Sequence, residues 1–133
     1  MNLRSVIVAA CLAVATPAAA QSPGESVTPN FEHAIPNIPG KSPIAVVVDY
    51  ALRGASRSHT HAKSAFVYAY VVSGAIESQG NDGPKRVYHA GESFYELPGA
   101  HHSVSRNAST TGPTLVELAH ETKPPCKRSW LVS

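Results

Sequence analysis

Two histidines one residue apart, His59 and His61, are the residues of this sequence best placed to hold a metal ion. In an extended segment, side chains at positions i and i+2 project from the same face, so both imidazoles can reach one ion. Imidazole is a frequent ligand for zinc, iron, copper and nickel. A lone His-x-His pair is still weak evidence for a metal site, so the interpretation depends on the residues around it.

A third histidine, His102, opens a strand-like segment that runs to Arg106. Strict alternation places His102 on one face with Val104 and Arg106, and His101 on the opposite face. Because Val104 is apolar, we predict that the His102 face points into the core. An ordinary buried histidine bonded to a backbone carbonyl is the alternative for His102. His101 is expected on the outer face or at the mouth of a pocket, where it could act as a catalytic group.

Glu96 is the carboxylate most able to join these histidines. It shares a strand face with Phe94, whose apolar ring predicts that this face points inward. Burying a carboxylate alone is costly, and a nearby cation would satisfy it. We therefore predict Glu96 as a metal ligand, or as a catalytic acid or base beside the ion. The alternative is a rim carboxylate paired with Arg106 or Arg86, and Gln79 is a weaker candidate oxygen donor.

Short β-rich runs separated by turn residues must position these side chains. The runs span 44–52, 65–72, 75–79, 85–89, 93–97, 102–106 and 114–119, with glycine, proline, asparagine or aspartate between most of them. This even spacing, without a sustained helical period, predicts an all-β sandwich or barrel. We expect Tyr68, Tyr70 and Tyr95 to fill its core, and the alternative is that they line a pocket.

Over residues 51–107 the sequence resembles the cupin superfamily. The matching residues are His59, His61 and Gly74 in the first cupin motif and Gly91, Gly99 and His102 in the second. The first motif departs from the family because no glutamate follows His61 at the usual spacing. In the second motif Arg106 takes the asparagine position, with Asn107 one step further on.

This resemblance implies an all-β, cupin-type jelly-roll β-barrel with a divalent metal ion at its centre. It implies His59, His61 and His102 as metal ligands, and we predict that Glu96 replaces the missing motif glutamate. Three imidazoles favour zinc, copper or nickel, whereas a carboxylate from Glu96 makes iron or manganese more plausible.

Three histidines with an optional carboxylate leave coordination positions open, which is how a catalytic metal is held. The resemblance implies an enzyme acting on a small-molecule substrate, with dioxygenase-like, isomerase or lyase chemistry in which Glu96 or His101 moves protons. The alternative is a non-catalytic module that binds a small ligand or a metal. The mature chain would carry ten Lys or Arg residues against nine Asp or Glu, without a basic stripe, so no nucleic-acid partner is predicted.

The N-terminus has the build of a cleaved secretory signal peptide, with a basic Arg4, an apolar run over 6–14 and small residues up to Ala20. We predict a periplasmic or secreted protein with no membrane anchor. Residues 8–11 also resemble a lipoprotein cleavage site, which would leave Cys11 acylated, but too few residues precede it.

Residues 21–42 contain four prolines, which exclude a helix or a central strand and predict an extended arm. Phe31, Ile35 and Ile38 could anchor this arm on the domain or on a second subunit of a homodimer, and a plain linker is the alternative. The predicted organisation is a signal peptide (1–20), a Pro-rich arm (21–42), a cupin barrel (43–120) and a C-terminal tail (121–133).

Overall fold

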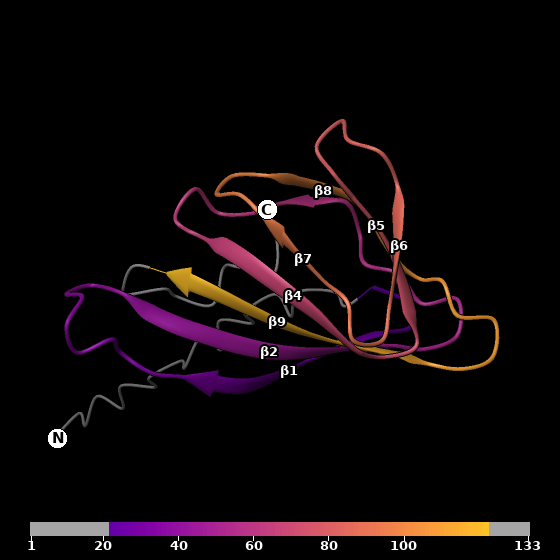
Figure 1. Cartoon of the computed structure of the whole chain (residues 1–133), viewed down its shortest axis with the longest axis horizontal. Helices are drawn as coiled ribbons and strands as arrows, with labels where there is room; N and C mark the ends of the chain where they lie inside the picture. The colour runs from indigo at the N-terminus through magenta and orange to yellow at the C-terminus, as the bar shows by residue number, and fades with distance from the viewer. Residues whose placement is uncertain (1–21, 123–133) are drawn as a thin grey trace, which may run out of the picture.

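The computed structural model describes residues 22–122, which form two antiparallel β-sheets and no helix (Figure 1). One sheet has five strands in the order β1-β2-β9-β4-β7, and the other has four in the order β3-β8-β5-β6. The strands are β1 (Glu25–Glu32), β2 (Ser42–Tyr50), β3 (His59–Thr60), β4 (Phe66–Ser73), β5 (Ala75–Gly80), β6 (Arg86–His89), β7 (Ser93–Glu96), β8 (His101–Asn107) and β9 (Thr114–Thr122).

The all-β prediction is confirmed, because strands and turns account for the regular structure of the described residues. Within residues 22–122 no helix is long and apolar enough to cross a membrane. The predicted signal peptide, its alternative acylation at Cys11 and most of the predicted tail lie outside these residues.

The core lies between the two sheets and is filled mainly by aliphatic side chains. Strand β4 shows the expected alternation, with Val67, Ala69 and Val71 buried between exposed neighbours. Strand β2 lies inside the five-stranded sheet and is buried along most of its length. The core cluster comprises Ile44, Val46, Val48, Tyr50, Ala69, Val71, Ile76 and Val116.

The prediction that three tyrosines fill the core is wrong. Tyr68 is 45% exposed, Tyr70 is 39% exposed and Tyr95 is 64% exposed. The small Ala69 and the aliphatic Val71 take the inward positions of β4 instead, so the alternating tyrosines must face outward. On that outer face Phe66 stacks on Tyr95, with ring centroids 5.8 Å apart.

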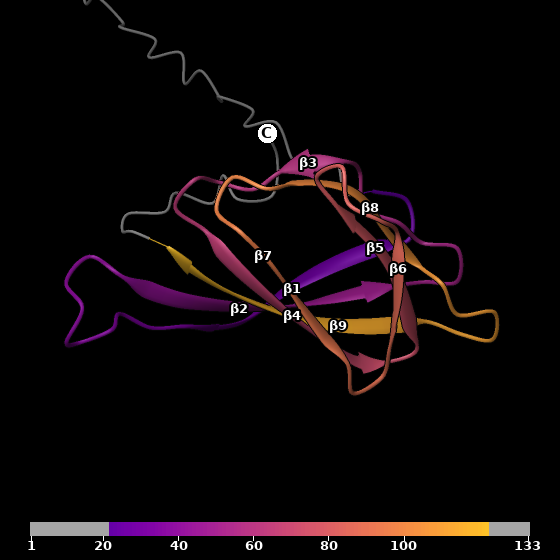
Figure 2. The same ribbon diagram turned by 45° about the horizontal axis from the view of Figure 1, so that its top comes forward.

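Part of the Pro-rich segment forms the edge strand β1, although no strand was predicted there. Strand β1 pairs only with β2, and its register shifts between Pro29 and Phe31. Proline is tolerated at such a position because an edge strand with a bulge can lack one ladder donor. The loop that follows β1 extends past the other strands in both views (Figures 1 and 2). Phe31 and Ile38 are 54% and 45% exposed, so the domain covers neither fully, and a homodimer stays a prediction.

Asn107, at the end of β8, ties three segments of the barrel together. Its Oδ1 accepts a hydrogen bond from the hydroxyl of the fully buried Thr114 at 2.8 Å, at the start of β9. Its Nδ2 lies within hydrogen-bond distance of three backbone carbonyl oxygens, those of Tyr50, Ala51 and Gly112. Because the asparagine is 8% exposed, removing it leaves these groups without a partner in a buried site.

Replacing this asparagine should destabilise the whole domain. We expect Asn107→Ala to lower the free energy of unfolding by about 3 kcal/mol, since several buried hydrogen bonds are lost together. Chemical denaturation measures the change. The control Asn30→Ala removes an exposed asparagine with one long contact, 3.4 Å to Glu117, and should cost less than about 0.5 kcal/mol. Equal losses in the two variants would contradict the assignment.

Candidate metal centre

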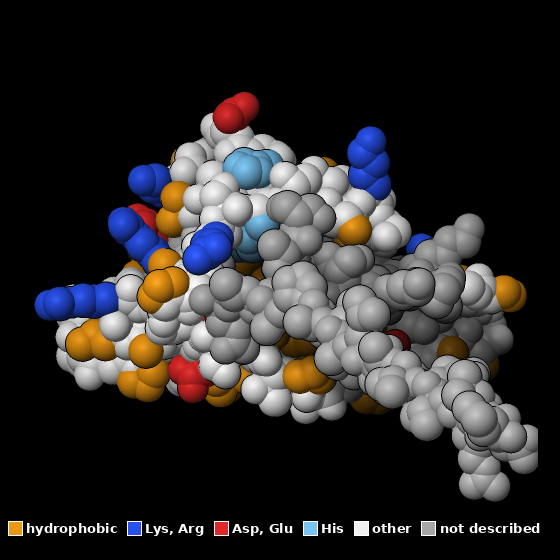
Figure 3. All heavy atoms as spheres, turned by 180° about the vertical axis from the view of Figure 1, so that it is seen from behind, with side chains coloured by type: hydrophobic (Ala, Val, Ile, Leu, Met, Phe, Trp, Pro, Cys, Tyr) orange, Lys and Arg blue, Asp and Glu red, His pale blue; other side chains and the backbone are white. Residues whose placement is uncertain are grey.

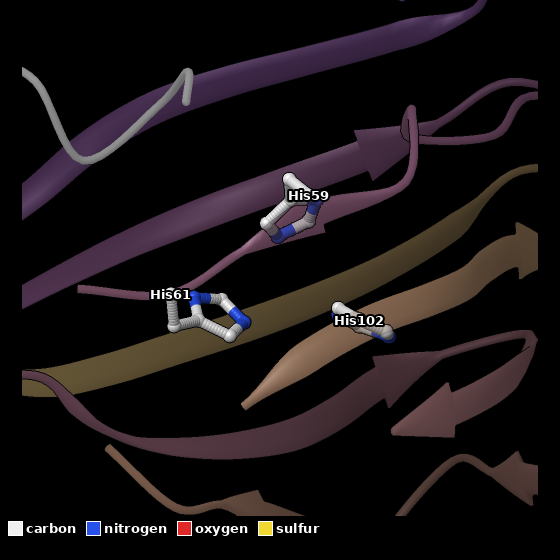
Figure 4. Close-up of side chains that lie close together, drawn as sticks. All are labelled: His59, His61 and His102. Carbon is white, nitrogen blue, oxygen red and sulfur yellow. The ribbon is translucent and has the colours of Figure 1, made fainter. Parts of the chain in front are cut away.

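Three histidine side chains converge between the sheets (Figure 4). His59 lies on β3 and is paired directly with His102 on β8, while His61 follows β3 after one residue. One ring nitrogen from each histidine lies within 4.8 Å of the others, which is close enough for a single ion to bind all three. The predicted convergence of these residues therefore exists in the structure.

Hydrogen bonds on the far side of the rings set the orientation of two of these histidines. The Nδ1 atom of His59 lies 2.8 Å from the carbonyl oxygen of Arg57, so this nitrogen carries the proton and Nε2 keeps its lone pair. The Nε2 atom of His102 lies 3.0 Å from the hydroxyl of Ser78, which leaves Nδ1 on the side of the other histidines. Such partners fix the imidazole tautomer and are typical of metal-binding histidines.

A β-bulge in β8 turns His102 inward. Gln79 of β5 pairs with Val104 but Gly80 pairs with His102, so Ser103 is an extra residue on β8. The extra residue breaks the alternation, and the prediction that Val104 and Arg106 share the inward face of His102 is wrong. Arg106 is exposed and bonds Glu77, and residues 105 and 107 are buried in its place. The bulge therefore also explains why the asparagine of the second motif stands one position late.

Glu96 contacts two of the three histidines, His61 and His102, and is 7% exposed. Its Oε2 is 2.7 Å from Nε2 of His61, and its Oε1 is 3.3 Å from Nδ1 of His102. Oε1 is buried and has no hydrogen-bond partner. A buried carboxylate oxygen without a hydrogen-bond partner, next to a cluster of imidazoles, is a strong reason for a cation here. The residues therefore fit a divalent metal ion.

The electrostatics of the cluster favour the protonation states that a metal site needs. Burial lowers the pKa of His102 to about 4, so its imidazole is neutral at physiological pH and free to donate a lone pair. Burial alone would raise the pKa of Glu96, but the hydrogen bond with His61 and the nearby imidazoles outweigh it and lower that pKa. Glu96 is thus a carboxylate in the folded protein.

Two residues named from the sequence do not reach the cluster. His101 pairs with Thr60 on the outer face, where its ring bonds the hydroxyls of Thr60 at 3.1 Å and Ser58 at 3.0 Å. Gln79 follows the inward-facing Ser78 and donates from Nε2 to a backbone carbonyl of the same hairpin. Both side chains are thus engaged by hydrogen bonds outside the three-histidine cluster.

A cavity of about 300 Å³ lies beside the cluster, between the β5–β6 hairpin and β7. Three of its lining residues also contact a histidine, namely Ser78, Phe94 and Glu96. Sequence reasoning missed Ser78, because a serine in a strand carries no signal until its cross-strand neighbour is known. Seen from behind, histidine side chains also reach the molecular surface (Figure 3). The cluster thus adjoins this cavity through Ser78, Phe94 and Glu96.

Solved structures of similar fold support the architecture. A conserved protein with a double-stranded β-helix domain from Klebsiella pneumoniae has a TM-score of 0.61, with 17% identity over 82% of this chain and 84% of its own. KdgF from a Halomonas species has a TM-score of 0.53, with 21% identity over 74% and 79%. An oxalate oxidase in complex with the substrate analogue glycolate has a TM-score of 0.59, with 21% identity over 77% of this chain and 53% of its own.

The sequence itself identifies the family. None of the curated proteins searched has a matching sequence. The model of the cupin domain family matches residues 46–119, which run from β2 to β9 and include all three histidines and Glu96. With more than half of its residues matched, this chain belongs to the cupin domain family.

Proposed function

We propose that this protein is a metal-dependent enzyme that holds a divalent ion on His59, His61 and His102 and acts on a small organic substrate. The observation that carries the proposal is Glu96. Its buried carboxylate touches two of the histidines on one side and lines a cavity of about 300 Å³ on the other. A site that only stored a metal would not need a carboxylate shared with a cavity of ligand size.

Hydrogen bonds from surrounding residues orient the histidine rings in the metal-free protein. The Arg57 carbonyl and the Ser78 hydroxyl hold the rings of His59 and His102, so little side-chain freedom is lost on binding. When bound, the ion would supply Lewis acidity to polarise an oxygen of the substrate.

Glu96 is the group we assign to proton movement. It is ionised and accepts a hydrogen bond from His61, so it can take a proton from a substrate that enters the cavity and return it later. This role suits isomerase, lyase or dioxygenase-like chemistry on a small organic molecule. An oxalate oxidase among the similar structures supports the idea that this barrel can carry an enzyme active site.

A non-catalytic binding module is the second candidate. The same carboxylate could close the site as a fourth protein ligand, because both of its oxygens lie within 3.3 Å of an imidazole nitrogen. A closed set of four protein ligands is typical of structural metal sites. Titration with small ligands separates an open metal site from one closed by four protein ligands, since a closed site leaves no position for them.

We propose that this activity lies outside the cytoplasm, as the signal-like segment 1–20 predicts. An exported chain that folds after translocation takes up its ion there, where the metals bound most tightly by nitrogen ligands have the advantage.

Glu96 should contribute to metal affinity. We expect Glu96→Gln to weaken zinc binding about 10- to 100-fold, because the variant keeps the shape of the side chain but removes a buried negative charge beside the ion. Isothermal titration of the metal-free protein measures the change. Glu92→Gln removes the same charge from an exposed turn of the same region and should leave the affinity unchanged. Unchanged affinity in the Glu96 variant would overturn the assignment.

The metal-free protein should prefer zinc, copper or nickel to manganese or iron. Three imidazoles supply the site with nitrogen ligands, for which the affinity of divalent ions rises from manganese to copper. Competition titration with pairs of ions tests this order, and His102→Ala should lose the binding that is being compared. If manganese or iron displaced zinc, an oxygen-rich ligand set would have to replace the three histidines.

A further inference from the structure

The cavity beside Glu96 has its own charge pattern. Among the described residues that line it, only two are charged: Glu96 at the inner end and Arg86 at the start of β6. Glu96 is engaged by His61 and His102. Arg86 pairs with Ser78 across β5 and β6, and cross-strand partners project from the same face. Arg86 thus lies on the cavity side of β6, but the residue is exposed, so it stands at the open edge of the cavity and not inside the barrel.

The guanidinium of Arg86 has no partner in the described part of the chain. The other arginine close to this sheet, Arg106, is bonded to Glu77 on the opposite face. No carboxylate of residues 22–122 forms an ion pair with Arg86. A bound divalent ion together with Glu96 would leave one positive charge, and Arg86 adds another. With an ion bound, the field in the cavity would favour an anion; in the metal-free protein the charges of Glu96 and Arg86 offset each other, and an anion is favoured only beside the guanidinium itself.

An aromatic pair provides the apolar part of the same cavity. Tyr88 and Phe94 both line it and stack on each other, with ring centroids 4.6 Å apart and planes 29° apart. Phe94 also contacts the edge of His102, with centroids 6.5 Å apart. This pair therefore forms an apolar side of the cavity that extends from near Arg86 to the histidine cluster. A flat or aliphatic ligand body can lie against it.

From these features we propose that the cavity binds a small organic carboxylate, with its charged group on Arg86 and its apolar body on Tyr88 and Phe94. The far end of such a ligand points at Glu96 and the histidine cluster. The inference rests on the proposed function, since it names the substrate class of the same site. Guanidinium is well suited to the role, because its fork of N–H donors matches a carboxylate in two parallel hydrogen bonds.

Benzoate and its neutral isostere benzamide are the probes for this inference. Both are titrated into the zinc-loaded and the metal-free protein, and binding is followed by calorimetry and by NMR shifts of Tyr88 and Phe94. We expect the wild type to bind benzoate at least 10-fold more tightly than benzamide. In Arg86→Gln this preference should disappear, and Arg86→Lys should restore it only in part.

Lys85→Gln is the matched control, because it removes the same charge one position away at a residue that does not line the cavity. It should keep the preference for benzoate. Equal benzoate affinities in the wild type and in Arg86→Gln would overturn the proposal, as would equal binding of benzamide and benzoate by the wild type.

Measurements on both the metal-free and the zinc-loaded protein distinguish failure of this inference from failure of the proposed function. A preference for benzoate that depends on Arg86 in the metal-free protein supports the anion site whether or not the ion binds. Failure of zinc to bind the wild type would overturn the proposed function alone. Zinc affinity should be the same in Arg86→Gln and the wild type, and a loss of zinc affinity in this variant would count against a separate anion site.

Discussion

The burial of one carboxylate between the two sheets is the constraint on which the site depends. Glu96 lies on β7 of the five-stranded sheet, whereas the two histidines that it contacts come from the segment after β3 and from β8. A charge that is 7% exposed needs partners of opposite character, since its solvation by water is lost. The imidazole cluster supplies one hydrogen bond and leaves one oxygen unpartnered. The contact therefore links the two sheets, and it leaves a buried carboxylate oxygen for which a cation would be a partner.

Much of the fold and part of this site could be predicted from local patterns. The inward position of Glu96 followed from its alternation with Phe94, and that alternation holds in β7. The pair His59 and His61 could be recognised because its spacing is local. Turn residues marked most strand boundaries, since glycine adopts turn conformations that other residues avoid and proline fixes φ and lacks a backbone donor.

The remaining features depend on pairing between distant strands, which a local pattern does not contain. The bulge that turns His102 inward exists because β8 carries one residue more than β5 over the same length. The prediction from strict alternation requires a regular strand, and it therefore put Val104 on the wrong face of β8. Strand β1 escaped prediction because its proline is acceptable only at a sheet edge, and edge position is a property of the assembled sheet. The contact of Ser78 with His102 has the same origin.

The shortness of β3 has a consequence for the motions of the domain. This strand consists of His59 and Thr60 alone, and it is held to the sheet only through β8. Segments with so few ladder hydrogen bonds open at a small fraction of the global free energy of unfolding. An ion that joins β3 to β8 would bind the closed form and not the open one, so it would add its binding free energy to the local closure of this segment. Slower amide hydrogen exchange around residues 59–61 would then report occupancy of the site while the distant strands stay unchanged.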